Sequence, residues 1–114
     1  MDKKVLLRIN SVLKHIDRIL KDTDGVSLKE LEESDLLLRA TCFSIAQIGE
    51  MMNQLEKSLS SKYDKIPWRE ARNMRNIIVH DYDSADVEQV YSTIRNDLPL
   101  LKTAFLTIKE DIKN

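Results

Sequence analysis

The chain has 114 residues, of which 42% are apolar and 32% charged, with only two glycines and two prolines. This length fits one domain over residues 1–114 and suffices to bury a core without metal or disulfide staples. Few loop-forming residues predict an all-α fold with long helices. The 18 basic and 19 acidic residues give a net charge of −1, which argues against a protein that coats nucleic acid through bulk electrostatics.

The single cysteine, Cys42, has no partner within the chain, which excludes an internal disulfide and favours a reducing compartment. A small buried thiol is its simplest interpretation. We find no basic N-terminal region followed by an apolar run and no apolar stretch of membrane-spanning length. We therefore expect a cytoplasmic protein without membrane association.

Apolar residues recur at alternating spacings of three and four between Val5 and Leu20, which predicts a first helix with one buried stripe. This stripe comprises Leu6, Ile9, Leu13, Ile16 and Leu20. Asp24-Gly25 should end the helix. Ser27 and Glu30 have the spacing of a capping box, which predicts a short helical turn.

A second helix should begin at Ser34 or Asp35 and run to about Ser60. Its main apolar stripe comprises Thr41, Ile45, Ile48, Met52, Leu55 and Leu59. A second stripe of small and polar residues comprises Phe43, Ala46, Gly49, Glu50 and Asn53. This second face suits either a dimer contact or ordinary packing inside a bundle.

A third helix should have Pro67 in its first turn, where the missing N–H costs nothing, and should extend to about His80. The segment from Lys62 to Arg75 is the most basic stretch of the chain. A solvated helix face and a local RNA contact both fit this charge pattern.

Asp83 or Ser84 should cap a fourth helix, whose apolar pattern continues to Ile112. Pro99 interrupts this pattern and should bend or split the helix near Asp97. Together these elements predict an up-and-down bundle of four to five helices.

The sequence RNIIVHDY at residues 75–82 places an arginine, four residues, a histidine, one residue and a tyrosine in order. On an ideal α-helix His80 lies one turn beyond Asn76, whereas Arg75 is rotated from His80 by about 140°. Arg75 and His80 of one chain are therefore poorly placed to act together.

Metal-free RNA cleavage needs a base for the ribose 2′-hydroxyl and a fixed cation for the phosphate, and it leaves a 2′,3′-cyclic phosphate. Histidine titrates near neutral pH, and arginine can donate two parallel hydrogen bonds to phosphate. At a helix C-terminus, beside Asp81, the protonated form of His80 would be favoured. One arginine and one histidine at this spacing also occur by chance, however.

The only other histidine is His15, which we expect at the surface or at the edge of the core. Carboxylates form no cluster at metal-ligand spacing in the sequence. We therefore expect neither a metal site nor a cofactor.

The segment resembles the HEPN superfamily, whose signature is an arginine, four to six residues and a histidine, with a polar residue often directly after the arginine. Arg75, Asn76 and His80 match this signature. Tyr82, two positions after the histidine, is similar to the HepT branch. The segments Ile48-Gly49-Glu50 and Asp97-Leu98-Pro99 also resemble the HepT branch.

The resemblance implies a helical bundle that forms a homodimer, with two copies of the motif facing each other across a cleft. Residues from both subunits could then converge on one phosphate. Arg75 would stabilise the phosphate and His80 would transfer protons. Asn76 would orient a neighbour or the substrate, and Glu50 would support the site or the dimer.

The resemblance further implies a toxin that cleaves RNA, with transfer RNA or messenger RNA as substrate and without a role for DNA. Its partner would be a small nucleotidyltransferase antitoxin, which transfers AMP from ATP onto Tyr82. An adenylate close to Arg75 and His80 would occupy the place of the RNA phosphate and block the cleft.

Two other functions stay open. A noncatalytic subunit could present nucleotide or substrate to the nucleotidyltransferase, although the presence of Arg75, His80 and Tyr82 favours the enzyme. A structural bundle with an accidental motif is the third interpretation, and monomeric behaviour in solution would favour it. For Tyr82, the simple alternative is an aromatic residue at a helix end, with its hydroxyl in water.

Overall fold

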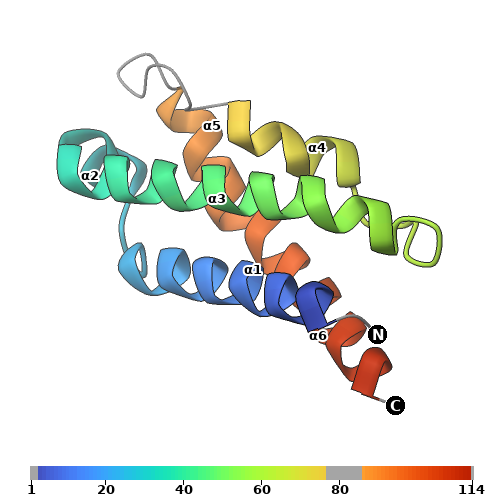
Figure 1. The fold of residues 1–114 in the computed structure, drawn as a ribbon. Helices are drawn as coiled ribbons and strands as arrows, with labels where there is room; N and C mark the ends of the chain where they lie inside the picture. Colours follow the sequence, from blue (N-terminus) through green and yellow to red (C-terminus); the bar gives the residue numbers. More distant parts are fainter. Residues whose placement is uncertain (1–2, 77–85, 114) are drawn as a thin grey trace.

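The computed structural model describes residues 3–76 and 86–113, and all regular structure among them is helical. The elements are α1 (Lys3–Asp22), α2 (Leu28–Glu33), α3 (Asp35–Leu59), α4 (Trp68–Asn73), the 3₁₀ helix η1 (Met74–Asn76), α5 (Val87–Ser92), the π-helical segment η3 (Thr93–Asp97) and α6 (Leu98–Lys113). Helices α1, α3, α4 and the run from α5 to α6 alternate in direction (Figure 1). The prediction of an all-α, up-and-down bundle is confirmed for this part of the chain.

Helix α1 packs against both α3 and α6, and this explains why its buried face is wider than the predicted stripe. Val12 and Ile19 are buried although the stripe left them out, while Leu6 and Leu20 are only half-buried. Gly25 ends the turn after α1 with a φ of 71°, a conformation that favours glycine. The predicted turn at Asp24-Gly25 is confirmed.

Both predicted helix starts in the next segment are confirmed. Ser27 accepts a hydrogen bond from the Glu30 backbone, and the Glu30 side chain accepts one from the Ser27 backbone, which completes the capping box of α2. Ser34, rather than Asp35, caps α3 by accepting from the Leu37 N–H. All six residues of the main apolar stripe of α3 are buried.

The third helix departs from the prediction in two ways. Pro67 is the N-cap of α4 and not part of its first turn, and its carbonyl accepts a hydrogen bond from the Ala71 N–H. The α-helix ends at Asn73, because the Met74 N–H donates to the Ala71 carbonyl three residues back and the chain tightens into η1. The prediction of a continuous α-helix is therefore wrong for Met74–Asn76. Its predicted end at His80 lies outside the described residues.

The fourth helix begins at Val87 and is capped by Asp86, whose side chain accepts from the Glu88 and Gln89 N–H groups. The expected caps Asp83 and Ser84 lie outside the described residues. The predicted interruption before Pro99 is confirmed, since the helix widens into η3 and returns to α-geometry at Leu98. A proline removes one helical hydrogen bond and clashes with the carbonyl four residues back, which the wider segment relieves.

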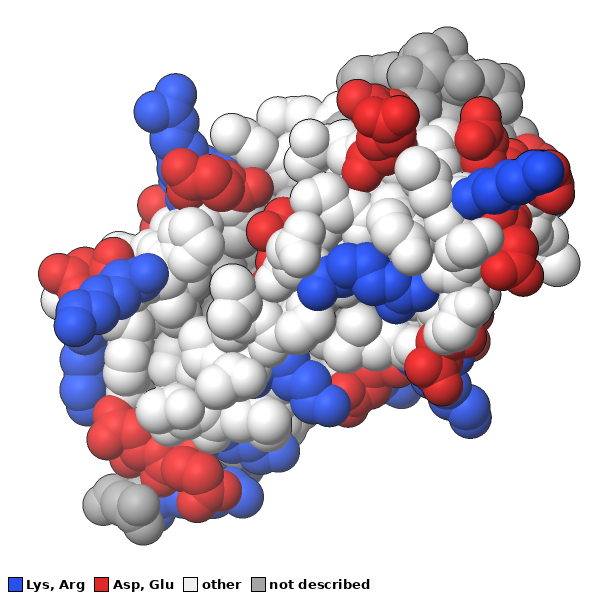
Figure 2. All heavy atoms as spheres, turned by 180° about the vertical axis from the view of Figure 1, so that it is seen from behind, with Lys and Arg blue, Asp and Glu red and all other residues white. Residues whose placement is uncertain are grey.

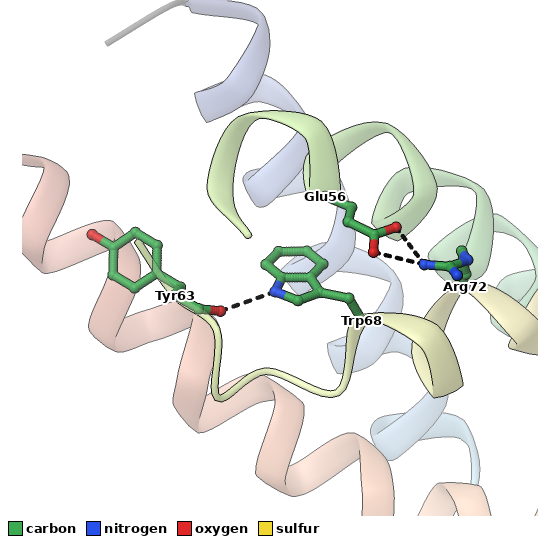
Figure 3. A network of polar contacts seen from close by, with 4 residues as sticks. All are labelled: Glu56, Tyr63, Trp68 and Arg72. Carbon is green, nitrogen blue, oxygen red and sulfur yellow. Dashed lines mark hydrogen bonds and ion pairs between the residues drawn. The ribbon is translucent and has the colours of Figure 1, made fainter. Parts of the chain in front are cut away.

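The core lies where α1, α3, α4 and α6 meet. Trp68 at the start of α4 packs edge-on against Phe105 of α6, with ring centroids 6.3 Å apart. The Trp68 indole N–H donates to the Tyr63 carbonyl in the loop before α4, at 2.9 Å (Figure 3). These contacts fix where α4, and the η1 segment that follows it, lie on the bundle.

Candidate functional site

Two residues of the predicted motif, Arg75 and Asn76, belong to η1, which packs against α3. The Asn76 side chain is exposed, as a residue that meets a substrate or a partner must be. His80 and Tyr82 lie outside the described residues, and so does the side chain of Arg75. Because Met74–Asn76 form a 3₁₀ helix, the ideal α-helical geometry used to calculate the angle between Arg75 and His80 does not hold for Arg75 and Asn76.

The predicted supporting residue Glu50 lies half-buried on α3. Its Oε1 atom accepts a hydrogen bond of 3.3 Å from Nε2 of Gln54, one turn further along the helix. On the second stripe of α3, Gly49 is buried, whereas Phe43 is 63% exposed. Residues of this stripe therefore have different environments, with Gly49 packed in the bundle and Phe43 facing outward.

An ion pair between α4 and α3 holds the helix that leads into the motif. The Arg72 Nη1 atom lies 2.6 and 2.5 Å from the two carboxylate oxygens of Glu56 (Figure 3). About a third of each side chain is exposed, so the pair is neither deeply buried nor freely solvated. Arg72 lies one turn before Arg75, so the ion pair holds the end of α4 against α3 where η1 begins. The pair therefore acts as a brace for the start of η1. No sequence pattern indicated this ion pair, because Glu56 is sixteen residues away on another helix.

The loop before α4 is fixed at its other end by α6. The Tyr63 hydroxyl donates a hydrogen bond to the Asp111 carboxylate, and the Lys62 ammonium lies 3.1 Å from the same group. The hydrogen bond from Tyr63, together with that from Lys62, lowers the pKa of Asp111. Two of the cations in the basic stretch, Lys62 and Arg72, are thus paired, while Lys65 and Arg69 are exposed.

Charge elsewhere is evenly mixed. Figure 2 shows acidic and basic side chains interspersed over the back of the molecule, with uncharged surface between them. Such a face creates no extended field of one sign. RNA contacts would therefore depend on a few local cations, as the net charge predicts.

We expect the Arg72–Glu56 pair to stabilise the fold by about 1 kcal/mol, since hydrogen bonds to charged groups exceed a simple exposed ion pair. Urea unfolding of Arg72→Ala, Glu56→Ala and the double variant gives this coupling energy. The matched control is the more exposed Arg39–Asp35 pair on α3, for which about 0.3–0.5 kcal/mol is expected. Equal coupling in both pairs would contradict a bracing role.

The remaining residues singled out from the sequence lie apart from the motif. Cys42 is buried in the core, and burial raises the pKa of its thiol to about 11. His15 is half-buried on α1, as expected, and burial lowers its pKa, with Arg18 and Lys14 adding to the effect. The raised pKa keeps the Cys42 thiol protonated near neutral pH, so this residue is not suited to act as a nucleophile.

Within residues 3–76 and 86–113, no three histidine, cysteine or acidic side chains are grouped so that they could hold a metal ion. Over the same residues, no helix is both long and apolar enough to cross a membrane.

Residues 12–108 match the family model of the HepT-like ribonucleases. A Methanocaldococcus jannaschii protein named "gamma-glutamylcyclotransferase and putative RNase" is 30% identical over 112 residues, which are 98% of this chain and 50% of that protein. A "putative RNase" of Caldanaerobacter subterraneus subsp. tengcongensis is 27% identical over 82% of this chain and 84% of its own length. A "probable ribonuclease HepT" of Thermococcus cleftensis is 28% identical over 68% of this chain and 74% of its own. The chain thus spans half of the first relative and most of the other two, and no solved structure matches it.

Proposed function

Because the chain belongs to the HepT-like ribonuclease family of the HEPN superfamily, we propose that it is a metal-independent endoribonuclease that cleaves RNA with Arg75 and His80. In this mechanism the His80 imidazole removes the proton of a ribose 2′-hydroxyl, and the oxygen attacks the adjacent phosphorus. The Arg75 guanidinium stabilises the charge that builds on the phosphate. The 5′-oxygen of the next nucleotide leaves with a proton, and a 2′,3′-cyclic phosphate remains.

The placement of the motif supports this proposal. Arg75 directly follows Met74, which is buried in the core, and Asn76 is exposed at the end of η1. The Arg72–Glu56 pair braces the preceding turn. A rigid base with polar residues at its exposed end suits a site that must hold a phosphate in one position.

We propose that the active form is a homodimer in which each subunit completes the site of the other. The outer face of α3 supports this idea, since Leu36 and Phe43 are seven residues apart on one helix face and are 72% and 63% exposed. Exposed apolar side chains of this size favour an interface. Glu50 lies seven residues beyond Phe43, so the same face leads towards the supporting residue.

As part of the same proposal, the protein acts as the toxin of a toxin–antitoxin pair. A cognate nucleotidyltransferase would transfer AMP to the Tyr82 hydroxyl, with loss of pyrophosphate from ATP. The added phosphate would compete with RNA for the Arg75 guanidinium.

Cleavage of total cellular RNA by the purified protein in the presence of a chelator tests the catalytic proposal. We expect cleavage of RNA with 2′,3′-cyclic phosphate ends, and no cleavage by the Arg75→Ala variant prepared in parallel. Cleavage that requires added metal would contradict the mechanism. Wild-type protein that is inert on RNA but binds its nucleotidyltransferase would instead support the noncatalytic subunit.

The modification is tested separately. Incubation with the neighbouring nucleotidyltransferase and ATP should add AMP to Tyr82, which peptide mass spectrometry locates. Tyr82→Phe should remain unmodified and should keep its ribonuclease activity in the presence of the partner. Tyr63 and Tyr91 are internal controls, since the Tyr63 hydroxyl bonds to Asp111 and that of Tyr91 to the Val26 carbonyl. AMP on either of them would overturn the assignment of Tyr82.

A further inference from the structure

A cavity of about 590 Å³ lies between α4 and the last helix. Its walls are mainly apolar and include Ile66, Ala71 and Met74 from the α4 side and Leu101 and Ala104 from α6. A volume in this range is typical of sites for small organic groups. Met74 immediately precedes Arg75, so a ligand that contacts Met74 lies next to the motif.

One wall of this cavity carries a line of hydrogen-bonding groups. Gln89, Thr93 and Asp97 follow one another at intervals of four along α5 and η3, and all three line the cavity. The π-helical segment η3 supplies two of them, and such segments often occur at functional sites.

The Thr93 side chain is one of the polar groups that line the cavity. Thr93 as a whole is only 2% exposed, and its hydroxyl forms no hydrogen bond with any described residue. The hydroxyl is not among the fully enclosed polar atoms without a partner, so it remains accessible from the cavity. A ligand that enters the cavity would offer this hydroxyl a partner.

We propose that this cavity binds a guanine base of the RNA, beside the phosphate held by Arg75. This inference rests on the proposed ribonuclease function. The faces of the base pack against the apolar walls, and its edge meets Gln89, Thr93 and Asp97. Proteins recognise single-stranded RNA in this way, through unstacked bases whose edges are hydrogen-bonded.

The choice of guanine follows from the hydrogen-bond acceptors of Asp97 in the cavity wall. A carboxylate offers two oxygens that only accept hydrogen bonds, and the guanine edge presents two adjacent donors, N1–H and the N2 amino group. The other three bases place an acceptor beside each donor on that edge, so they cannot satisfy both oxygens of Asp97.

The charges around the cavity favour a base over a phosphate inside it. Glu70 and Asp97 are both exposed at its edge, where they repel an anion, while Lys65 is the one cation among the described lining residues. Lys65 is free of ion pairs within the described part of the chain, and it can contact the sugar–phosphate backbone outside the cavity.

Binding of the four ribonucleoside 5′-monophosphates to the full-length protein tests the assignment, because these probes differ only in the base. We expect GMP to bind at least about tenfold more tightly than UMP, which corresponds to about 1.4 kcal/mol. Asp97→Asn should abolish this preference. Glu88→Gln is the matched control, since Glu88 lies exposed on α5 and does not line the cavity. A GMP preference that survives in Asp97→Asn, or no preference in the wild type, would overturn the proposal.

Mapping the cleaved RNA ends separates this inference from the proposed function. We expect wild-type cuts next to guanine, loss of that preference in Asp97→Asn, and wild-type cleavage and preference in Glu88→Gln. Ala104→Trp, which narrows the cavity, should lower GMP affinity at least tenfold, with circular dichroism confirming that it folds. Cleavage without base preference would support the proposed ribonuclease function and overturn the guanine site. Asp97-dependent GMP binding without any RNA cleavage would support the guanine site and refute the ribonuclease.

Discussion

Replacing His80 by alanine should lower the rate of RNA cleavage by about 10²- to 10⁴-fold, the range that a positioned acid–base group contributes. The loss should appear in kcat more than in KM, because proton transfer takes place in the transition state and Arg75 still binds the phosphate. Single-turnover cleavage of an end-labelled RNA, with protein in excess, measures the chemical step directly.

The chain offers a matched control for this experiment. His15 is the only other histidine, and it is half-buried on α1 with its pKa lowered by burial. His15→Ala should therefore cleave RNA at the wild-type rate. Sedimentation of His80→Ala should give the same oligomeric state as the wild type. A His80→Ala protein as active as wild type, or a His15→Ala protein as inactive as the motif variant, would remove His80 from the mechanism.

The variants Arg75→Lys and Arg75→Ala distinguish the charge of Arg75 from its hydrogen-bonding geometry. Arg75→Lys retains the positive charge but loses the planar arrangement of donors that can bind a phosphate through two hydrogen bonds. If Arg75 acts through this geometry, lysine should restore only part of the activity that alanine removes. Full activity of Arg75→Lys would mean that charge alone is required there.

Much of the bundle follows from local patterns in the sequence. Helix α3 was predicted within one residue at each end, because its apolar spacing is regular and Ser34 supplies a cap. The capping box of α2 and the break at Gly25 were equally local, since each depends on residues within one turn. Pro99 marked the place where the last helix departs from α-geometry.

The errors arose where tertiary contacts decide the backbone. The tightening at Met74 occurs where its side chain enters the core and η1 packs on α3, which no spacing indicates. Asp86, which caps α5, was not selected, because several acidic and hydroxyl residues in this region could cap a helix; the expected caps Asp83 and Ser84 lie outside the described residues. Val12 and Ile19 were missed because α1 has two neighbours rather than one.

The candidate site divides in the same way. Arg75, Asn76, His80 and Tyr82 could be selected because the motif is contiguous in sequence. The Arg72–Glu56 pair and the cavity could not, because each combines residues from segments far apart in the chain. Thr93 illustrates the point, since a threonine in a helix gains significance only when its side chain is found to line a cavity.

Phe105→Ala should lower the free energy of unfolding by about 3–5 kcal/mol, the usual cost of removing a buried aromatic ring. Phe105 is fully buried and packs edge-on against Trp68. Since small domains are stable by only about 5–15 kcal/mol, this loss is a large part of the total. Urea unfolding followed by circular dichroism measures it.

The neighbouring Leu106, which is 45% exposed on the same helix, is the control, and Leu106→Ala should cost less than about 1 kcal/mol. Equal losses for the two variants would mean that α6 is not packed through Phe105. The expected difference also bears on the site, because Trp68 starts α4 seven residues before Arg75. Loss of the ring should therefore lower RNA cleavage even under conditions in which Phe105→Ala remains folded, because α4, which leads into η1, loses the contact of Trp68 with α6.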